Sequence, residues 1–220
     1  MLKIQEYKSF VFDCDGVILN SNKIKTRAFR VASFPFGYEA SRSLENYHLK
    51  NGGISRYAKF DYFLENIVSI NSKKNKELYL KKMLKIYSEE TEKGLLDSEI
   101  TYGLHSLRTK TKDSSWSIVS GGDQDQLRSI FAKKEIKHLF NGGIFGSPNT
   151  KDEILKRELG RGSIKLPALF LGDTELDHRV SVSNGLDFIF VSAWTEFRSY
   201  EQYCIENSIK NISKVYELIA

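Results

Sequence analysis

The chain has 220 residues, of which 40% are hydrophobic, so it can bury one sizeable core and an inserted lobe. Its formal charge of +5 comes from 33 basic and 28 acidic residues that are scattered among one another, a pattern that argues against a nucleic-acid partner. No apolar run approaches the roughly 20 residues of a membrane span, and two cysteines are too few for a disulfide framework, so we expect a globular, cytoplasmic protein with no membrane partner.

An apolar segment at residues 7–13 predicts the first strand, which ends in Asp13, with Asp15 two positions later. In an extended chain the side chains of these two aspartates return to the same face. A carboxylate beside a metal and a phosphoryl group is a candidate nucleophile, and this is the role expected for Asp13. Asp15 is a candidate general acid and base, which would protonate a leaving oxygen and later deprotonate water. Ser21 and Asn22 favour the start of a helix.

The next segment, residues 18–94, shows helical patterns and no clear strand. One apolar face contains Phe60, Phe63, Leu64, Ile67 and Val68, and another contains Leu80, Met83, Leu84 and Tyr87. The segment therefore predicts a small helical bundle inserted directly after the first motif.

A turn within this bundle is predicted at Gly52 and Gly53, and Ser55 is a candidate cap for the helix that follows. Arg56 comes next, in the first turn of that helix. Its planar guanidinium suits a phosphate or a carboxylate, and the bundle should face the catalytic cleft. Arg56 is therefore a candidate for substrate specificity, although a plain helix connection would also explain the two glycines.

The segment at residues 115–120 predicts a buried strand that ends in Ser120 and is followed by Gly121. The serine hydroxyl and the bare glycine N–H can approach an anion closely, so both are candidate phosphate ligands. A helix is expected at 123–134, a short apolar segment follows near residues 144–145, and another helix is expected at 151–160. Lys151 begins this last helix and would neutralise a phosphate or orient the nucleophile.

A strand is also predicted at residues 167–171, and it is followed by Asp173 and Asp177. The carboxyl ends of strands are where open α/β sheets bind ligands. Because Mg²⁺ prefers hard oxygen ligands and commonly takes one or two carboxylates, Asp13 and Asp173 predict a Mg²⁺ cofactor. Beyond them we expect a helix after Glu175, a strand at 187–191 and one or two helices over 196–220.

Strands that alternate with helices predict the α/β class, with a doubly wound, Rossmann-like parallel sheet and an inserted α-helical cap domain. We expect the catalytic core to comprise residues 1–17 and 95–220, and the cap domain to comprise residues 18–94.

The four polar segments, in this order, resemble the motifs of the haloacid dehalogenase superfamily of phosphotransferases. The resemblance covers residues 7–20 and 95–192, and the helical insert corresponds to a C1-type cap. The implied roles are nucleophile for Asp13, general acid and base for Asp15, phosphate ligands for Ser120 and Lys151, magnesium ligands for Asp13, Asp173 and the Asp15 carbonyl, and ligand or support of the metal shell for Asp177.

The function that follows is a Mg²⁺-dependent phosphomonoesterase that hydrolyses a small phosphate ester through an aspartyl phosphate. Residues 51–57 and 190–192 further resemble hydrolases of bacterial surface-polysaccharide (capsule) biosynthesis, which implies a sugar phosphate, or an amino-alcohol phosphate on a nucleotide-sugar precursor. A phosphosugar mutase would use the same residues, and a catalytically silent interaction module is a third possibility. The sequence leaves open whether the protein is a monomer or a dimer.

Overall fold

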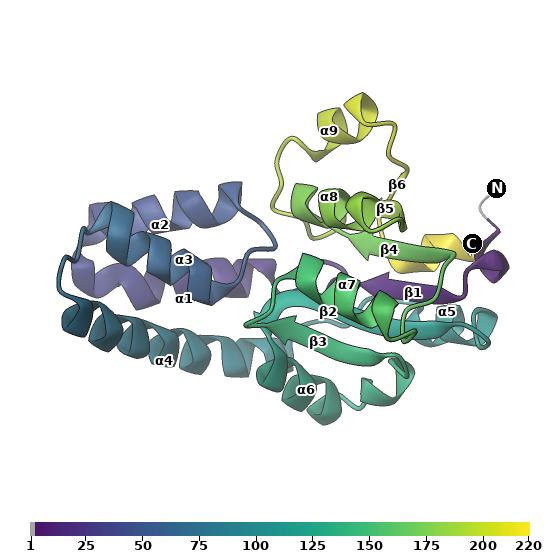
Figure 1. The fold of residues 1–220 in the computed structure, drawn as a ribbon, viewed down its shortest axis with the longest axis horizontal. Helices are drawn as coiled ribbons and strands as arrows, with labels where there is room; N and C mark the ends of the chain where they lie inside the picture. Colours follow the sequence, from purple (N-terminus) through teal and green to yellow (C-terminus); the bar gives the residue numbers. More distant parts are fainter. Residues whose placement is uncertain (1–2) are drawn as a thin grey trace.

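The structure is a computed structural model that describes residues 3–220. Its centre is a parallel sheet of six strands in the order β3-β2-β1-β4-β5-β6 (Figure 1). The strands are β1 (Ser9–Phe12), β2 (Ser115–Asp123), β3 (Gly143–Ser147), β4 (Ala168–Gly172), β5 (Asp187–Val191) and β6 (Asn211–Ile212). The first strand is central, so the residues that follow it lie between those that follow β2 and β4.

Successive side chains of each strand point to opposite faces of the sheet, and helices bury both faces. Phe10 and Phe12 belong to one apolar cluster, and Val11, between them, belongs to the other. Helices α5 (Leu104–Lys110) and α6 (Gln124–Lys133) contribute to the first cluster, whereas α7 (Lys151–Gly160) and α8 (Glu175–Ser183) contribute to the second. The predicted doubly wound α/β sheet is therefore confirmed.

Four helices between β1 and β2 form a separate group, which we call the helical insert. They are α1 (Asn22–Ser33), α2 (Tyr38–Lys50), α3 (Arg56–Tyr62) and α4 (Lys73–Asp97). The insert also has a 3₁₀ turn at Phe34–Phe36 and a π-helical turn at Phe63–Ile67, and two further 3₁₀ turns lie outside it at Ile4–Glu6 and Lys137–Leu139. The insert lies at one end of the sheet in Figure 1 and has its own core, which includes Phe29, Phe60 and Tyr87. As expected, Ser55 is the N-cap of α3, and its hydroxyl accepts a hydrogen bond from the Ala58 N–H.

The C-terminal segment differs from the prediction of one or two helices over residues 196–220. Helix α9 (Tyr200–Glu206) is present, but β6 then pairs with β5, and only a 3₁₀ turn at Val215–Leu218 follows. The prediction took the spaced apolar residues of this segment for one face of a helix. In the structure Ile212 and Val215 are buried, whereas Ile205 on α9 is 79% exposed, so these residues do not form one buried helix face.

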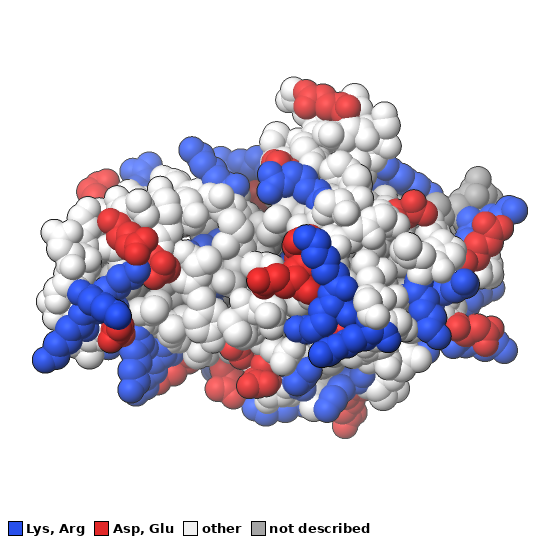
Figure 2. Space-filling model, viewed as in Figure 1, with Lys and Arg blue, Asp and Glu red and all other residues white. Residues whose placement is uncertain are grey.

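On the face drawn in Figure 2, Lys and Arg lie beside Asp and Glu in several places, and blue atoms also run together over the part of the core where Figure 1 places α7 and β3. Within residues 3–220, no helix combines the length and the apolar character that crossing a membrane requires. Cys14 and Cys204 are both buried free thiols, as their number predicted.

Candidate active site

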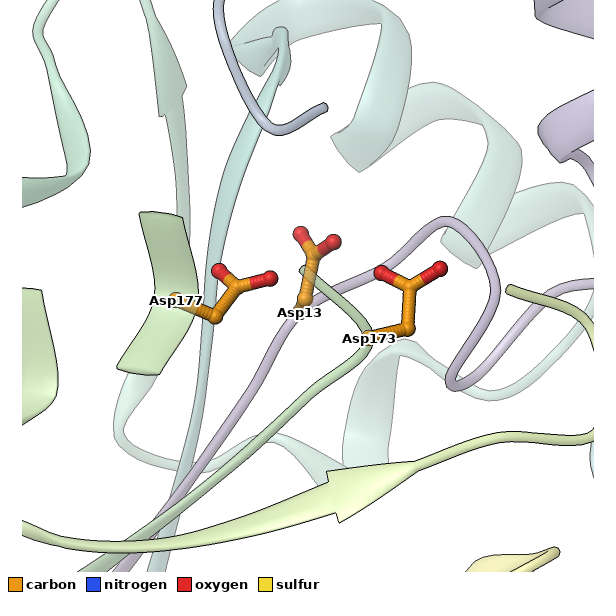
Figure 3. Close-up of side chains that lie close together, drawn as sticks. All are labelled: Asp13, Asp173 and Asp177. Atoms are coloured by element: carbon orange, nitrogen blue, oxygen red, sulfur yellow. The ribbon is translucent and has the colours of Figure 1, made fainter. Parts of the chain in front are cut away.

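Two aspartates meet at the carboxyl end of the sheet because their strands are neighbours in register. Phe12 of β1 pairs with Leu171 of β4, so Asp13 and Asp173, which follow these residues, lie close together at the carboxyl edge of the sheet. Asp177 lies in the first turn of α8, and Asp13 stands between Asp177 and Asp173 in Figure 3. The three carboxylates each offer an oxygen within 4.8 Å of the other two, and all three residues are buried.

Lys151 lies against two members of this cluster. Thr150 and Glu153 form a capping box that fixes the start of α7, and Lys151 is its first helical residue. The Lys151 Nζ is 3.0 Å from Asp13 Oδ1 and 2.5 Å from Asp177 Oδ1. The Thr174 hydroxyl donates to the other oxygen of Asp177 at 2.6 Å, so both carboxylate oxygens of Asp177 have partners.

The electrostatics of the cluster favour a cation. Burial, more than the neighbouring carboxylates, raises the pKa of Asp13 to about 7 and holds the pKa of Asp173 well above its usual range. Burial alone would lower the pKa of Lys151, but Asp13 and Asp177 raise it above the ordinary value. Among residues 3–220, the Lys151 ammonium is the one polar partner near Asp13 Oδ1. Hard, buried and under-compensated carboxylate oxygens fit a divalent cation such as Mg²⁺.

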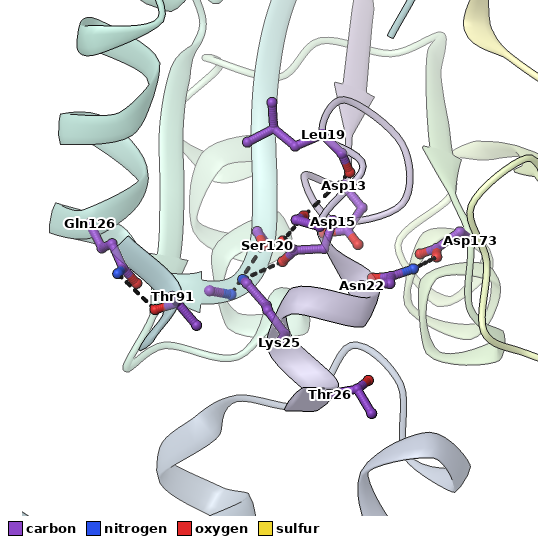
Figure 4. Close-up of polar contacts among 12 residues, drawn as sticks. Asp13, Asp15, Leu19, Asn22, Lys25, Thr26, Thr91, Ser120, Gln126 and Asp173 are labelled. Atoms are coloured by element: carbon purple, nitrogen blue, oxygen red, sulfur yellow. Dashed lines mark hydrogen bonds and ion pairs between the residues drawn. The ribbon is translucent and has the colours of Figure 1, made fainter. Parts of the chain in front are cut away.

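Asp15 is held by two residues of the insert side. The Ser21 hydroxyl donates to Asp15 Oδ1 at 2.5 Å. The Lys25 ammonium donates to Asp15 Oδ2 at 2.5 Å, and Figure 4 shows these two side chains pointing toward each other. Ser21 precedes α1 but makes no side-chain cap to it. Asn22, the first residue of α1, donates to Asp173 Oδ2 at 2.7 Å. The start of α1 therefore positions carboxylates of two different motifs.

Ser120 and Gly121 lie in a bulge of β2. The pairing of β2 with β3 is interrupted between Val119 and Asp123, and such bulges often occur beside active sites. Ser120 is fully buried, and its Oγ accepts a hydrogen bond from the Gly122 N–H, which leaves the hydroxyl proton for another acceptor. Gly121 faces the insert so closely that a Cβ at this position would lie 2.2 Å from the Gly53 carbonyl oxygen.

A cavity of about 210 Å³ lies between the insert and the core. Its core side is lined by Asp13, Asp15, Gly121 and Asp173. Ser120 and Lys151 do not line the cavity directly. Arg56 lines the insert side, and only 6% of its surface is exposed. Its Nη2 is 3.5 Å from Asp123 Oδ2, and its Nη1 donates to Ser88 at 3.2 Å. Its Nε has no hydrogen-bond partner among the residues that the structure describes.

Several residues of the site were missed by sequence reasoning. The sequence predicts only a helix start at Ser21 and Asn22. Nothing in the sequence separates Lys25, His48 and Lys59 from the other polar residues of a helical bundle. Lys25, His48 and Lys59 all line the cavity. No local signal marks them, because each has its partner on a different element: Lys25 on α1 contacts Asp15 in the loop after β1, and Lys59 on α3 contacts His48 on α2.

A family model described as haloacid dehalogenase-like hydrolase matches residues 10–191, a range that includes all four polar segments. The chain belongs to this family. It is therefore an enzyme of the hydrolase type, and the resemblance inferred from the four segments is confirmed at the level of the family.

Solved structures of similar fold cover nearly the whole chain. A protein described as a predicted phosphatase from Clostridium acetobutylicum matches with a TM-score of 0.71 and 20% identity over 96% of each chain. A beta-phosphoglucomutase from Clostridium difficile matches with a TM-score of 0.70 and 18% identity over 96% of this chain and 93% of the other. CbbY from Rhodobacter sphaeroides, solved in complex with phosphate, matches with a TM-score of 0.71 and 15% identity, covering 97% and 96%. These likenesses concern the fold. No curated protein matches the chain.

Proposed function

We propose that the protein is a Mg²⁺-dependent phosphomonoesterase that hydrolyses a small phosphate ester through an aspartyl phosphate on Asp13. One observation carries the proposal: Asp13 lies at the edge of the cavity with Lys151 and Asp173 beside it, and Asp15 lies on the same wall in a fixed orientation. This arrangement supplies a nucleophile, a site for a cation and a separate acid and base.

The first step forms a bond between an Asp13 oxygen and phosphorus while the bond from phosphorus to the leaving oxygen breaks. Asp15 gives a proton to that oxygen, which departs as the alcohol. In the second step Asp15 takes a proton from water, the water oxygen attacks phosphorus, and the bond to Asp13 breaks to release phosphate. Lys151, which lies 3.0 Å from Asp13, offsets the negative charge in both steps.

Asp13, Asp173 and the Asp15 carbonyl would hold Mg²⁺, and Asp177 would either ligate it or steady its surroundings through Lys151 and Thr174. When bound, Mg²⁺ reduces the repulsion between the Asp13 carboxylate and an anionic phosphoryl group. The pKa of Asp13, raised to about 7 by burial, is consistent with a carboxylate that needs such a cation to remain ionised.

Ser120, the Gly121 N–H and Lys151 are proposed phosphate ligands, and Arg56 is proposed to contact the rest of the substrate. The domain division is part of the same proposal: a core of residues 1–17 and 95–220, and a C1-type cap of residues 18–94 that closes over the substrate. Gly53 packed against Gly121 supports a closed cap.

The finer proposal is a cytoplasmic enzyme that acts on a sugar phosphate, or on an amino-alcohol phosphate of a nucleotide-sugar precursor, in capsular polysaccharide biosynthesis. It is supported by the resemblance at residues 51–57 and by a cavity of about 210 Å³, which suits a small ligand.

Phosphate release from a panel of sugar, amino-alcohol and nucleotide-sugar phosphates tests the proposal, with native protein and the Asp13→Asn variant, each with and without Mg²⁺. We expect release that needs Mg²⁺ and disappears in the variant. Release that persists in Asp13→Asn would contradict the nucleophile.

A phosphosugar mutase is distinguished by ³¹P NMR of a sugar 1-phosphate incubated with a trace of the corresponding bisphosphate. A phosphatase yields inorganic phosphate, whereas a mutase yields the isomeric sugar phosphate. If neither signal changes with any compound, the silent interaction module is favoured.

A further inference from the structure

The buried cations around the cavity fall into two kinds. Lys25 and Lys151 each lie within 3.0 Å of a carboxylate. Lys59, on α3, is 1% exposed and also lines the cavity, yet no carboxylate among residues 3–220 lies within ion-pair distance of its ammonium. Buried lysines without a carboxylate partner are costly and uncommon, so Lys59 requires a reason for its position.

The hydrogen bonds around Lys59 assign its partner as a neutral imidazole. The Thr26 hydroxyl has one proton, which it donates to Glu196 at 2.6 Å, so it accepts from His48 Nε2 at 3.0 Å. His48 Nδ1 then carries no proton and accepts from the Lys59 Nζ at 2.7 Å. Burial, followed by Lys59 itself, holds the pKa of His48 well below its usual range, in agreement with this assignment.

The Lys59 amine is therefore held in place by one neutral acceptor, and its other protons have no acceptor among the described residues. Burial lowers the pKa of Lys59 to about 7, and the nearby Lys25 lowers it further than Asp15 raises it. An anion beside the amine would reverse both effects.

Arg56 lies three residues before Lys59 on α3, a spacing that places the two side chains on one face of the helix. Within residues 3–220 its only carboxylate contact is Asp123, at 3.5 Å, and Tyr57 donates to the same carboxylate oxygen at 2.8 Å. The buried Nε of Arg56 has no hydrogen-bond partner in this described range. Two cations on one helix face thus line the insert side of the cavity with donor capacity to spare.

We propose that Lys59, oriented by His48 and assisted by Arg56, binds a second anionic group of the substrate, a carboxylate or a phosphate on the leaving group. The inference rests on the proposed function, because it describes the part of a phosphate ester that lies away from Asp13. It narrows the substrate class to esters whose alcohol portion is itself an anion, and it makes Lys59 a determinant of specificity. Neutral sugar phosphates of the same size lack the group that would complete this wall.

Matched esters test the proposal in two arms. Glucose 6-phosphate has a neutral leaving group, 6-phosphogluconate adds a carboxylate and glucose 1,6-bisphosphate adds a phosphate; glycerol 3-phosphate and 3-phosphoglycerate form a smaller pair. In native protein with Mg²⁺, we expect at least one anionic member to have a kcat/KM that is about 10-fold or more above its neutral partner. The member preferred tells whether carboxylate or phosphate is recognised.

The Lys59→Met variant keeps the length of the side chain and removes the charge. We expect its ratio of anionic to neutral kcat/KM to fall to within about 3-fold of unity, mainly through KM. Lys50→Met is the matched control, because Lys50 also lines the cavity but is exposed, so solvent screens its charge. Lys59→Gln serves as a second variant should Lys59→Met fail to fold. Equal losses on anionic and neutral esters in the folded variant would overturn the inference.

A binding measurement separates this inference from the proposed function. Calorimetric titration of each ester into Asp13→Asn protein with Mg²⁺ needs no turnover. If no ester releases phosphate, the phosphatase fails, yet tighter binding of the anionic member that is lost in the Asp13→Asn, Lys59→Met double variant still supports the anion site. Equal affinity for anionic and neutral members, or no binding of any anionic member, overturns it even where phosphate release proceeds.

Discussion

Lys151 in the core and Lys59 in the helical insert are both almost fully buried beside the same site, yet their surroundings differ. Lys151 lies between the carboxylates of Asp13 and Asp177, which raise its pKa. Lys59 bonds a neutral histidine, and its burial lowers its pKa to about 7. The folding of the chain alone compensates the first charge, and it leaves the second for a ligand to compensate.

This difference matches a division of labour between the two parts of the molecule. The groups that carry out the chemistry need a fixed geometry before substrate arrives, and paired charges at the ends of strands and at the starts of helices provide it. The insert needs to distinguish substrates, and a cation that gains its partner only on binding makes affinity depend on the substrate's own charge.

The largest expected effect comes from the acid and base of the core. Asp15→Asn should lower kcat for the preferred ester by about 10²- to 10⁴-fold, because an amide can neither protonate the leaving oxygen nor deprotonate water. The measurement is steady-state phosphate release with Mg²⁺. Asp125→Asn, at an exposed position in the first turn of α6, is the control and should stay within about 2-fold of native. A variant at position 15 that keeps a tenth of the native kcat would refute the role given to Asp15.

Removing the two buried lysines in turn tests the comparison directly. Lys151→Met should lower the free energy of unfolding by about 3–5 kcal/mol at pH 7.5 without metal, because it leaves Asp13 and Asp177 buried without their cation. Lys59→Met should leave stability unchanged or increase it, because no carboxylate loses a partner. Urea denaturation measures both. Similar losses in the two variants would show that Lys59 is compensated within the folded chain after all.

The pH dependence of stability gives a smaller and sharper test. Below pH 7 Lys59 is protonated in both the folded and the unfolded chain, so the cost of burying its charge is fully present. Between about pH 7 and 10 only the unfolded chain keeps the proton, since the folded pKa is lowered to about 7 from 10.5, and the cost is lost as pH rises. The stability of native protein relative to Lys59→Met should therefore increase across this window by up to about 1.4 kcal/mol per pH unit.

Denaturation series of the two proteins at matched pH values give this difference directly, because every other titrating group is common to both. A difference that stays flat from pH 7 to 10 would mean that Lys59 keeps an ordinary pKa in the folded protein.

The contrast between the two lysines also explains what the sequence could predict. The residues at the strand ends follow short apolar runs that predict buried strands. The local pattern alone therefore placed Asp13, Ser120 and Asp173 at one edge of the sheet. Lys59 is one of many lysines in the helical segment, and its burial depends on Phe29 and His48, which reach it from other helices. Strand β6 was missed for a similar reason, since two residues become a strand only through pairing with β5.

The smallest effect is expected where the insert meets the core. The Tyr57 hydroxyl donates to Asp123 Oδ2 at 2.8 Å, and Asp123 in turn caps α6 by accepting from the Gln126 N–H. Tyr57→Phe removes one partly exposed hydrogen bond and should lower the free energy of unfolding by about 1 kcal/mol or less. KM should rise by up to about 5-fold, because the closed arrangement that brings α3 over the cavity is less populated.

Tyr62→Phe is the control for this variant, because Tyr62 stacks on Tyr47 within the insert and its ring, not its hydroxyl, makes the contact. If the two variants share the same KM, the bond to Asp123 does not hold the insert against the core. In that case the contact of Arg56 with Asp123 is what joins α3 to the core side of the cavity. The anion that Lys59 and Arg56 are proposed to bind would then compete with Asp123 for the Arg56 guanidinium.

Closure of the insert and recognition of the second charge would then be a single event. Arg56→Lys keeps the charge but loses the planar guanidinium, so it would weaken closure and recognition together.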